Sequence, residues 1–254
     1  MRDIGSVVAA ALGGAFLAVA VVFAAANTGY LPGAVSGPMA DARIRSYLLT
    51  HPEIVTEMTD RVQARQEAVT AATAAATIKK IGLKTFFDPS VAFVTGPENA
   101  KTSLVEFYDY DCPYCRASLP AMERFYEKHK NDTRFSFIEF PIPSLHGPGA
   151  DLAAMVSLAA RRQPDKYVPL HFALMSQEGA LDEAMIYAAA AKVGMDIAKL
   201  KKDVADPIIA QTLATSKNLA HSAGIDGTPT FIINGVMHPG AVDDDELKKL
   251  TKTS

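Results

Sequence analysis

Two cysteines, Cys112 and Cys115, are the only thiols in the 254-residue chain, and they stand three positions apart in the run CPYC. A metal site, a structural disulfide and a reactive dithiol would each use such a pair. A disulfide that closes so short a loop removes little entropy from the unfolded chain, so it stabilises a fold weakly. The spacing therefore favours a reactive pair that alternates between two thiols and a disulfide.

Metal binding is the next alternative for these thiols. A zinc or copper clip needs more ligands than two thiols supply, and none of the six histidines forms a paired ligand spacing with another. We therefore expect no metal and no cofactor, while copper(I) handling by the two thiols remains an alternative. His146 stands close to a Gly-rich helix start, where a surface turn is favoured over an active-site position.

The residues after Cys112 predict a helix from Pro113 to about residue 129, since Pro is tolerated at the first helical position. One face of this helix carries four residues at spacings of four, three and four: Cys115, Leu119, Met122 and Tyr126. That face should be buried, so Cys115 is expected to be the inner, resolving thiol. Cys112 is expected to be an exposed attacker at the helix start, where unpaired N–H groups and the helix dipole favour a thiolate.

The overall composition limits the classes of partner. The formal net charge is -3, which gives no reason to expect nucleic acid or an acidic membrane surface as a partner. Hydrophobic residues make up 49% of the chain, enough for a substantial core. We therefore expect one or two folded domains and no nucleic-acid partner.

An apolar segment stands near the N-terminus. Residues 7–26 carry no charge and are long enough, as a helix, to span a hydrocarbon core about 30 Å thick. The run of alanines at 24–26 also satisfies the small-residue pattern that precedes signal cleavage. Residues 1–26 therefore predict a signal anchor, with a cleaved signal peptide as the alternative. Either one places the following chain outside the cytoplasm, where disulfides form.

A helical stalk is predicted over residues 43–82, after a linker rich in Gly and Pro at residues 27–42. Thr50 and Glu53 fit a capping box, so a second helix is expected to start there. Four small or apolar residues then repeat every seven positions: Val55, Val62, Val69 and Ala76. A coiled coil also needs apolar residues at a second position between these repeats, and Arg65 occupies one of those positions. The pattern therefore fits either a coiled coil between chains or one arm packed on its own domain.

Residues 83–254 contain both strand-type and helical patterns, which is typical of a mixed α/β domain. Two β-type runs, VAFVTG and TSLVEFYDY, are expected to pair as a hairpin, and residues 133–143 predict a third strand. Residues 147–223 predict four or five helices. The pair Asn234-Gly235 predicts a tight turn between two further strands, and a last helix follows.

The predicted order is β-α-β, a helical block and β-β-α, which fits a central sheet with helices on its faces. This order resembles the thioredoxin fold with a helical subdomain inserted at about residues 147–223. The expected fold class is therefore α/β, a thioredoxin-like fold with an inserted helical subdomain, preceded by the helical stalk and the hydrophobic segment.

Two motifs make the resemblance more specific. The run EFYDYDCPYC, followed more than a hundred residues later by GIDGTPTFIING, resembles the DsbA-like branch of the thioredoxin superfamily over residues from about 86 to 254. The run IRSYLLTHPEIVTEMTDRVQARQ is similar to the N-terminal helical region of ScsC-like proteins, named for suppression of copper sensitivity. Some of those proteins oligomerise through that region.

The resemblance implies roles around the cysteines. It implies a cis peptide bond between Thr228 and Pro229, beside which the backbone of Thr228 would pair with an extended substrate; an ordinary trans turn is the alternative. Glu106 matches a buried acidic position of the family that relays the proton of Cys115, although a solvated strand residue would also fit its place. Two residues between the cysteines would tune the thiolate and the redox potential: Pro113 and Tyr114.

The function that follows is thiol–disulfide exchange on extracytoplasmic proteins, which forms or isomerises disulfides through the CPYC pair. The implied partners are unfolded or misfolded secreted proteins, a membrane redox partner that resets the pair, the membrane through residues 1–26, and further copies of the chain through residues 43–82. The expected location is the periplasmic side of a bacterial inner membrane, anchored, or soluble in the periplasm after cleavage. A copper-handling or chaperone-like module on the same scaffold is the alternative.

Overall fold

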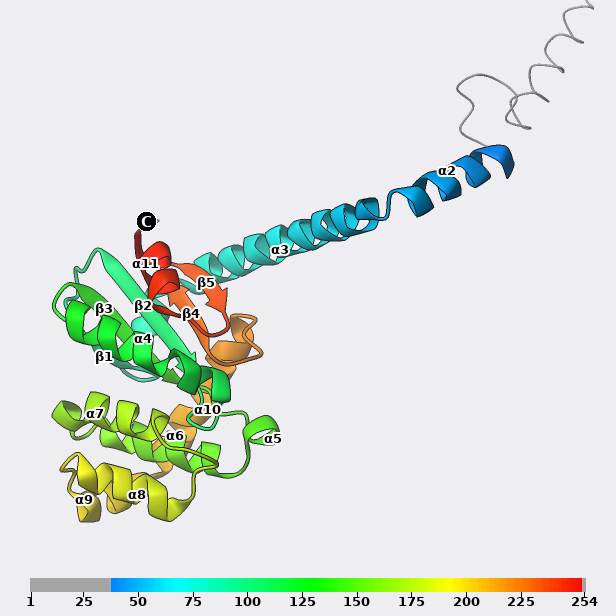
Figure 1. Cartoon of the computed structure of the whole chain (residues 1–254). Coiled ribbons are helices and arrows are strands. Elements are labelled where there is room, and N and C mark those ends of the chain that lie inside the picture. Colours follow the sequence, from blue (N-terminus) through cyan, green and yellow to red (C-terminus); the bar gives the residue numbers. More distant parts are fainter. Residues whose placement is uncertain (1–37, 253–254) are drawn as a thin grey trace, which may run out of the picture. The chain divides into compact units, whose positions relative to one another are not determined.

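A computed structural model describes residues 38–252, and the chain divides into two compact units, Met1–Ala68 and Val69–Ser254. The described part of the first unit is helical, with α2 (Pro38–Thr50) and the start of α3 (Glu53–Ile81) (Figure 1). Its large apolar side chains are exposed to solvent in the single chain: Ile44, Tyr47, Leu48, Leu49, Val55, Met58 and Val62. The described part of this unit therefore has no apolar core of its own for these side chains.

The beginning of the stalk differs from the prediction in two ways. Helix α2 already starts at Pro38, so the end of the predicted linker 27–42 is helical, because Pro suits a first helical turn. The predicted capping box is wrong. The Thr50 hydroxyl donates to the carbonyl oxygens of Ser46 and Tyr47, at 2.9 and 3.0 Å, so it satisfies the end of α2 instead of starting α3.

The apolar segment at residues 1–26 lies outside the described residues, as does the linker up to residue 37. Within residues 38–252, no helix is both long and apolar enough to cross a membrane.

The second unit is built on a five-stranded sheet in the order β1-β3-β2-β4-β5 (Figure 1). Strands β2 (Thr102–Tyr108) and β3 (Thr133–Glu139) run parallel, while β1 (Phe93–Thr95), β4 (Thr230–Ile233) and β5 (Val236–Pro239) join in antiparallel pairs. The β4–β5 turn confirms the prediction at Asn234-Gly235, where both residues take positive φ angles, 51° and 84°.

The predicted hairpin between the first two strands is wrong, because β1 pairs with β3 and not with β2. At the end of β1 the chain turns at Gly96, whose φ is +84°. A Cβ atom there would lie 2.0 Å from the carbonyl oxygen of Thr133 at the start of β3. Only glycine allows the backbone to turn this close to β3 before it crosses to β2.

Side chains alternate along β2 between two covered faces. Leu104 points into a core with Met122 of α4 (Pro113–His129) and Leu247 of α11 (Asp244–Lys252). Val105 and Phe107 point into a second core with Ile78 of α3, the 3-10 helix η1 (Leu83–Phe87) and the end of α10 (Pro207–Ser222). Glu106 shares the face of Leu104 and therefore lies on the side of the sheet that α4 covers.

A helical block is inserted between β3 and β4, as predicted, and its main helices are α6 (Gly149–Ala160), α7 (Pro164–Met175), α8 (Glu183–Lys192), α9 (Ile197–Val204) and α10 (Figure 1). The short helix α5 (Pro143–His146) leads into it. The predicted strand 133–143 ends earlier, at Glu139, because prolines at 141 and 143 cannot donate to a ladder. The block and the sheet share one continuous apolar core, so the unit matches the predicted α/β thioredoxin-like class.

Gly96→Ala tests the tight turn beside β3. The matched control is Gly224→Ala, since Gly224 also has a positive φ, +76°, but a Cβ atom added there meets no other atom within 4 Å. Both changes strain the backbone, and only Gly96→Ala adds a collision with the Thr133 carbonyl. We expect Gly96→Ala to lower the free energy of unfolding by at least about 2 kcal/mol more than the control. Equal losses in urea denaturation would contradict this account of the turn.

Candidate active site

Cys112 lies at the step from strand β2 to helix α4, at the N-cap position of the helix. Its backbone N–H donates to the carbonyl oxygen of Asp109 at 3.1 Å, and Pro113 follows at the first helical position. The chain therefore leaves the sheet, turns once and enters the helix at the first cysteine. The predicted helix from Pro113 to residue 129 is confirmed at both ends.

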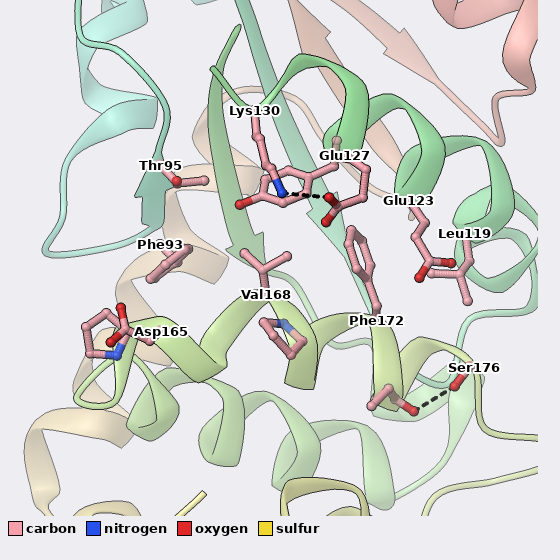
Figure 2. A pocket seen from close by; sticks show the side chains of 14 residues that line it. Phe93, Thr95, Leu119, Glu123, Glu127, Lys130, Asp165, Val168, Phe172 and Ser176 are labelled. Carbon is pink, nitrogen blue, oxygen red and sulfur yellow. Dashed lines mark hydrogen bonds and ion pairs between the residues drawn. The ribbon is translucent and has the colours of Figure 1, made fainter. Parts of the chain in front are cut away.

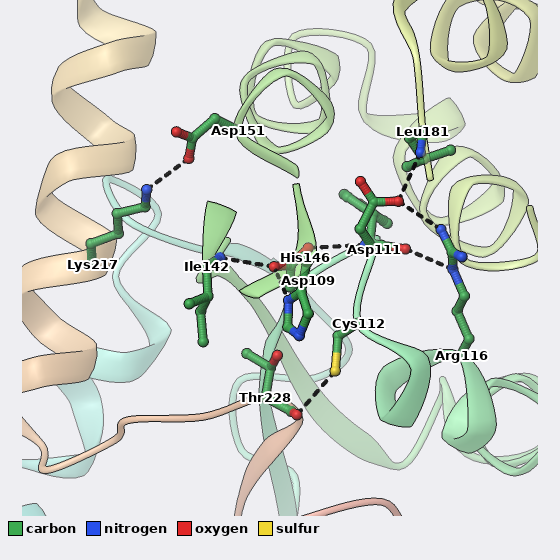
Figure 3. A network of polar contacts seen from close by, with 11 residues as sticks. Asp109, Asp111, Cys112, Arg116, Ile142, His146, Asp151, Leu181, Lys217 and Thr228 are labelled. Atoms are coloured by element: carbon green, nitrogen blue, oxygen red, sulfur yellow. Dashed lines mark hydrogen bonds and ion pairs between the residues drawn. The ribbon is translucent and has the colours of Figure 1, made fainter. Parts of the chain in front are cut away.

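The two motifs that are 116 positions apart in sequence meet at this cysteine. The Cys112 thiol donates a hydrogen bond of 3.1 Å to the carbonyl oxygen of Thr228, and the Thr228–Pro229 peptide bond is cis, as predicted (Figure 3). Cys112 is 1% exposed, so the prediction of an exposed attacker is wrong. The prediction considered only the position of Cys112 at the start of α4. The loop that contains Thr228 lies far away in the sequence, and it covers the sulfur.

The two thiols have opposite proton affinities. The pKa of Cys112 is lowered to about 5, chiefly because its sulfur accepts a hydrogen bond from Cys115, with further contributions from Thr228 and then from backbone N–H groups of the first turn. Cys115 is also 1% exposed, and burial raises the pKa of its thiol well above the usual range. The predicted burial of Cys115 is confirmed, its role as the resolving thiol stays a prediction, and neither cysteine forms a disulfide.

Glu106 lies in the interior behind the cysteines. It is 2% exposed, which confirms the buried placement over the solvated one, and burial raises its pKa to about 8. Its charge would raise the pKa of Cys115, so the carboxyl group lies within electrostatic reach of the inner thiol. Its Oε2 atom has no hydrogen-bond partner among the described residues, and Nε2 of His171 is 3.9 Å away.

The two residues between the cysteines lie at the surface. Tyr114 is 67% exposed, and Pro113 is exposed as well. The backbone N–H of Tyr114 contributes to the low pKa of Cys112, but its ring does not. Any effect of the Tyr114 ring on the dithiol therefore acts from the solvent side.

A polar network that the sequence did not predict supports the active-site loop (Figure 3). Oδ2 of Asp109 accepts hydrogen bonds from Nδ1 of His146 at 2.6 Å and from the backbone N–H of Ile142 at 2.8 Å, while its Oδ1 accepts from the N–H of Asp111 at 2.9 Å. The prediction of a free surface turn for His146 is therefore wrong. The histidine after β3 instead holds the loop that precedes Cys112.

Arg116 of α4 ties the same loop to the helical block. Its guanidinium donates to the carbonyl oxygens of Tyr110 at 2.9 Å and Gly179 at 2.6 Å, and to Oδ1 of Asp111 at 2.9 Å (Figure 3). The same Oδ1 accepts the N–H of Leu181 at 2.9 Å. These bonds join the residue before Cys112, the helix after it and the loop before α8 into one unit.

A groove of about 640 Å³ between α4 and α7 is a separate feature of this surface (Figure 2). Phe172 and Val168 form part of its apolar lining, and Glu127 is paired with Lys130 at 2.6 Å on its edge. Neither cysteine lines this groove, so it is not the site of the dithiol.

Among residues 38–252, no group of three or more His, Cys, Asp or Glu side chains is placed to hold a metal ion.

The sheet order, the dithiol at the start of α4 and the cis-proline against it define the class of thiol–disulfide oxidoreductases with a thioredoxin-like fold. The family model of the DSBA-like thioredoxin domain matches residues 103–252, and the chain belongs to that family. The model of the copper resistance protein ScsC N-terminal domain matches residues 41–68, which confirms the ScsC-like resemblance of the stalk.

Solved structures agree with this assignment. The catalytic domain of Proteus mirabilis ScsC is 28% identical, with a TM-score of 0.59 over 70% of this chain and 96% of that chain. The thiol-disulfide exchange protein alpha-DsbA2 from Wolbachia pipientis is 26% identical, with a TM-score of 0.63 over 73% of this chain and 98% of that chain.

Part of this chain is also similar to a segment of larger curated proteins. The chain is 30% identical over 160 residues to Na(+)/H(+) antiporter NhaA 1 of Salinispora arenicola, which covers 63% of this chain and 24% of that protein. The chain thus spans about a quarter of the length of the curated relatives it matches.

Glu106→Gln tests the buried carboxyl group. Because the pKa of Glu106 rises from 4.5 to about 8 on folding, the unfolded chain releases this proton at lower pH than the folded chain does. Protonation thus favours the folded state, and that contribution is lost as the pH rises from about 4.5 to 8. We expect the wild type to lose stability relative to Glu106→Gln across this window, by a few kcal/mol in total.

The measurement is urea denaturation at a series of pH values. The control is the exposed Glu123→Gln on α4, which removes a carboxyl group that water reaches in both states. A difference between wild type and Glu106→Gln that stays constant with pH would show that the buried group is not protonated in the folded chain.

Proposed function

We propose that the chain donates or rearranges disulfide bonds in extracytoplasmic proteins, with Cys112 as the nucleophile and Cys115 as the resolving thiol. The main support for this proposal is that the pKa of Cys112 is lowered while the pKa of Cys115 is raised. At neutral pH a thiol with a pKa of about 5 is a thiolate, the form that attacks disulfides, whereas the inner thiol stays protonated until it is needed.

Exchange takes two steps on this geometry. The Cys112 thiolate attacks one sulfur of a substrate disulfide, a mixed disulfide forms, and the other substrate sulfur leaves with the electron pair. Cys115 then loses its proton and attacks the Cys112 sulfur, so that the enzyme is oxidised and the substrate is reduced. Donation of a disulfide is the reverse sequence, in which Cys115 leaves and must regain a proton.

The low pKa of Cys112 also bears on the direction of transfer. A stabilised thiolate favours the reduced form of the pair, so the enzyme's own disulfide is readily given up. This favours a disulfide donor or shuffling enzyme over a reductant. Glu106, protonated below a pKa of about 8, is suited to supply the proton that Cys115 needs when it leaves.

Thr228 and Pro229 are proposed to bind the substrate backbone. The Thr228 carbonyl oxygen faces the Cys112 sulfur, so an extended segment paired with this carbonyl would bring its own sulfur against the nucleophile. Pro113 and Tyr114 lie exposed at the same rim, where their contacts with a substrate would tune the exchange.

The proposed setting is the periplasmic side of a bacterial inner membrane, with residues 1–26 as anchor or cleaved signal. The proposed partners are unfolded or misfolded secreted proteins and a membrane redox partner that resets the pair. Residues 43–82 are proposed to join several copies of the chain, since the match to the ScsC N-terminal domain and the exposed apolar side chains of the stalk both fit an oligomer.

Cys112→Ser tests the assigned chemistry in oxidative refolding of a reduced secreted protein. We expect the variant to refold the substrate only at the uncatalysed rate, because a hydroxyl at this position cannot exchange disulfides. The matched control is Ala117→Ser, which adds a hydroxyl to an exposed position of the same helix and should retain wild-type rates. Full activity of Cys112→Ser would remove the basis of the proposal.

Copper handling is the second candidate, because the family model that matches the stalk is named for copper resistance. Copper handling requires that the wild-type chain binds copper(I) tightly and that each single Cys→Ser variant loses this affinity. Catalysed refolding without copper(I) binding favours the exchange enzyme.

Val62→Glu tests the proposed oligomer. Val62 is 69% exposed on the apolar face of α3, so a charge there should prevent that face from being buried between chains. Ala64→Glu is the control, since residue 64 lies about 200° further around the helix. Light scattering on the chain from residue 27 should give several chains for wild type and Ala64→Glu, and one for Val62→Glu. A wild type that is already a single chain would exclude the oligomer.

A further inference from the structure

The interior between the sheet and the helical block contains ionisable groups that the two-step exchange does not use. Three of them are the histidine of α7, His171, and two tyrosines at the end of β2, Tyr108 and Tyr110, each at most 2% exposed. A second carboxyl group, Glu139 at the end of β3, is 1% exposed. So many polar groups in a core are expensive unless they bond to one another.

These groups form a row that begins behind the cysteines, with hydrogen bonds between all neighbours except Glu106 and His171. Oε2 of Glu106 is 3.9 Å from Nε2 of His171, and Nδ1 of His171 is 3.2 Å from the Tyr110 hydroxyl. The Tyr110 hydroxyl faces that of Tyr108 at 3.3 Å, and the Tyr108 hydroxyl donates to Oε1 of Glu139. The row therefore connects two buried carboxyl groups through one imidazole and two phenols.

The hydrogen positions in the row are consistent with proton transfer in one direction, from Glu106 towards Glu139. The Tyr110 hydroxyl has a single hydrogen, and its two acceptors, Oγ of Ser157 at 2.8 Å and the Tyr108 hydroxyl, both lie away from the histidine. Nδ1 of His171 must therefore carry a hydrogen to bond to Tyr110. Nε2 is then bare and faces Glu106, whose carboxyl group still holds its proton in a large share of molecules near pH 8, because burial raises its pKa to about 8. The distance between these two atoms is 3.9 Å, so the proposed transfer requires them to move closer.

We propose that this row moves the proton that Cys115 exchanges during each catalytic cycle, so that no water has to enter behind the active-site helix. The inference rests on the proposed function and adds to it a path for the proton. In the resolving step Glu106 passes its hydrogen to Nε2 of His171, Nδ1 passes one to Tyr110, Tyr110 to Tyr108, and Tyr108 to the carboxylate of Glu139. The emptied Glu106 carboxylate accepts the hydrogen of Cys115.

Atoms and electrons balance in this step. Each intermediate group gains one hydrogen and loses one, the S–H bond of Cys115 breaks, and an O–H bond forms on Glu139. The electron pair of the Cys115 sulfur forms the bond to Cys112, and the substrate sulfur leaves with its own pair. The reverse sequence returns the proton to Cys115 when a disulfide is donated.

Two properties of the row fit this task. Once Glu106 has passed its hydrogen to Nε2, and before it takes the hydrogen of Cys115, His171 can donate from Nε2 to the Glu106 carboxylate, so the same imidazole faces both protonation states of that group. Burial also raises the pKa of Glu139 to about 8, so the two ends hold a proton about equally well, and near pH 8 the state with Glu106 protonated and Glu139 ionised is well populated. The other ionisable groups that act on the ends are Cys115 on Glu106, and Asp109 and Arg161 on Glu139.

The core offers a matched control for the row. The hydroxyl of Tyr167 on α7 lies 2.9 Å from that of Tyr108, in the same buried cluster, but it is a side branch and not part of the row. Tyr110→Phe breaks the row, whereas Tyr167→Phe removes the same atom from the same core and leaves the row intact. Glu139→Gln removes the far acceptor without touching the cysteines.

The experiment uses the reduced full chain and an aryl disulfide, dithiobis(nitrobenzoate), which releases one coloured thiolate when Cys112 attacks and a second when Cys115 resolves. We expect the first phase to follow the pKa of Cys112, near 5, in every variant. The second phase at about pH 8 should slow at least about tenfold in Tyr110→Phe and in Glu139→Gln, and remain at the wild-type rate in Tyr167→Phe.

The outcomes separate the two proposals. A second phase in Tyr110→Phe and Glu139→Gln as fast as in Tyr167→Phe overturns the proton row and leaves the dithiol mechanism in place. A wild-type chain that releases only one thiolate, with no second phase at any pH, contradicts the dithiol mechanism itself. Slowing in Tyr110→Phe but not in Glu139→Gln also overturns the row, since the far carboxyl would then play no part.

Discussion

The hydrogen bond between the Cys112 sulfur and the Thr228 carbonyl oxygen is the contact on which the arrangement of the site depends. It forms only if the end of β2 and the start of α4 meet the loop before β4, which is more than a hundred residues further along the chain. The sheet provides the convergence, because β4 lies beside β2 in antiparallel register. The helical block is inserted between β3 and β4 without disturbing this register, since both strands pair directly with β2.

The interior behind the site has a cost in stability. Two carboxyl groups, Glu106 and Glu139, are buried without a cation close enough to neutralise them, and each keeps one oxygen atom without a hydrogen-bond partner among the described residues. A core of apolar residues would be more stable at neutral pH. The burial that causes this cost also raises the pKa of both carboxyl groups to about 8. Such groups can exchange protons near neutral pH, as the proposed mechanism requires for Cys115.

Local patterns predicted much of this structure, whereas contacts between distant segments did not follow from them. The spacing of four, three and four after Cys112 placed Cys115 in the interior, because such a face depends only on residues close together in sequence. The pairing of β1 with β3 could not be read in this way, and Cys112 was mispredicted as exposed because its covering loop comes from residue 228. His171 and Glu139 have no neighbouring motif in the sequence, and their hydrogen-bond partners lie on other elements. Hydrophobic periodicity contains no information about such bonds.

Ionisation of Cys112 changes the contact with Thr228 itself. A thiol donates to the carbonyl oxygen at 3.1 Å, but a thiolate has no hydrogen to donate, and two electron-rich atoms at that distance repel each other. With a pKa of about 5 the thiolate is the main form at neutral pH, so the carbonyl is released from the sulfur under those conditions. In the proposed function, this carbonyl would then be free to accept an N–H from an extended substrate. If Cys112 and Thr228 have the proposed roles, loss of the Cys112 proton both activates the nucleophile and frees the backbone acceptor beside it, which couples reactivity to binding at a single atom.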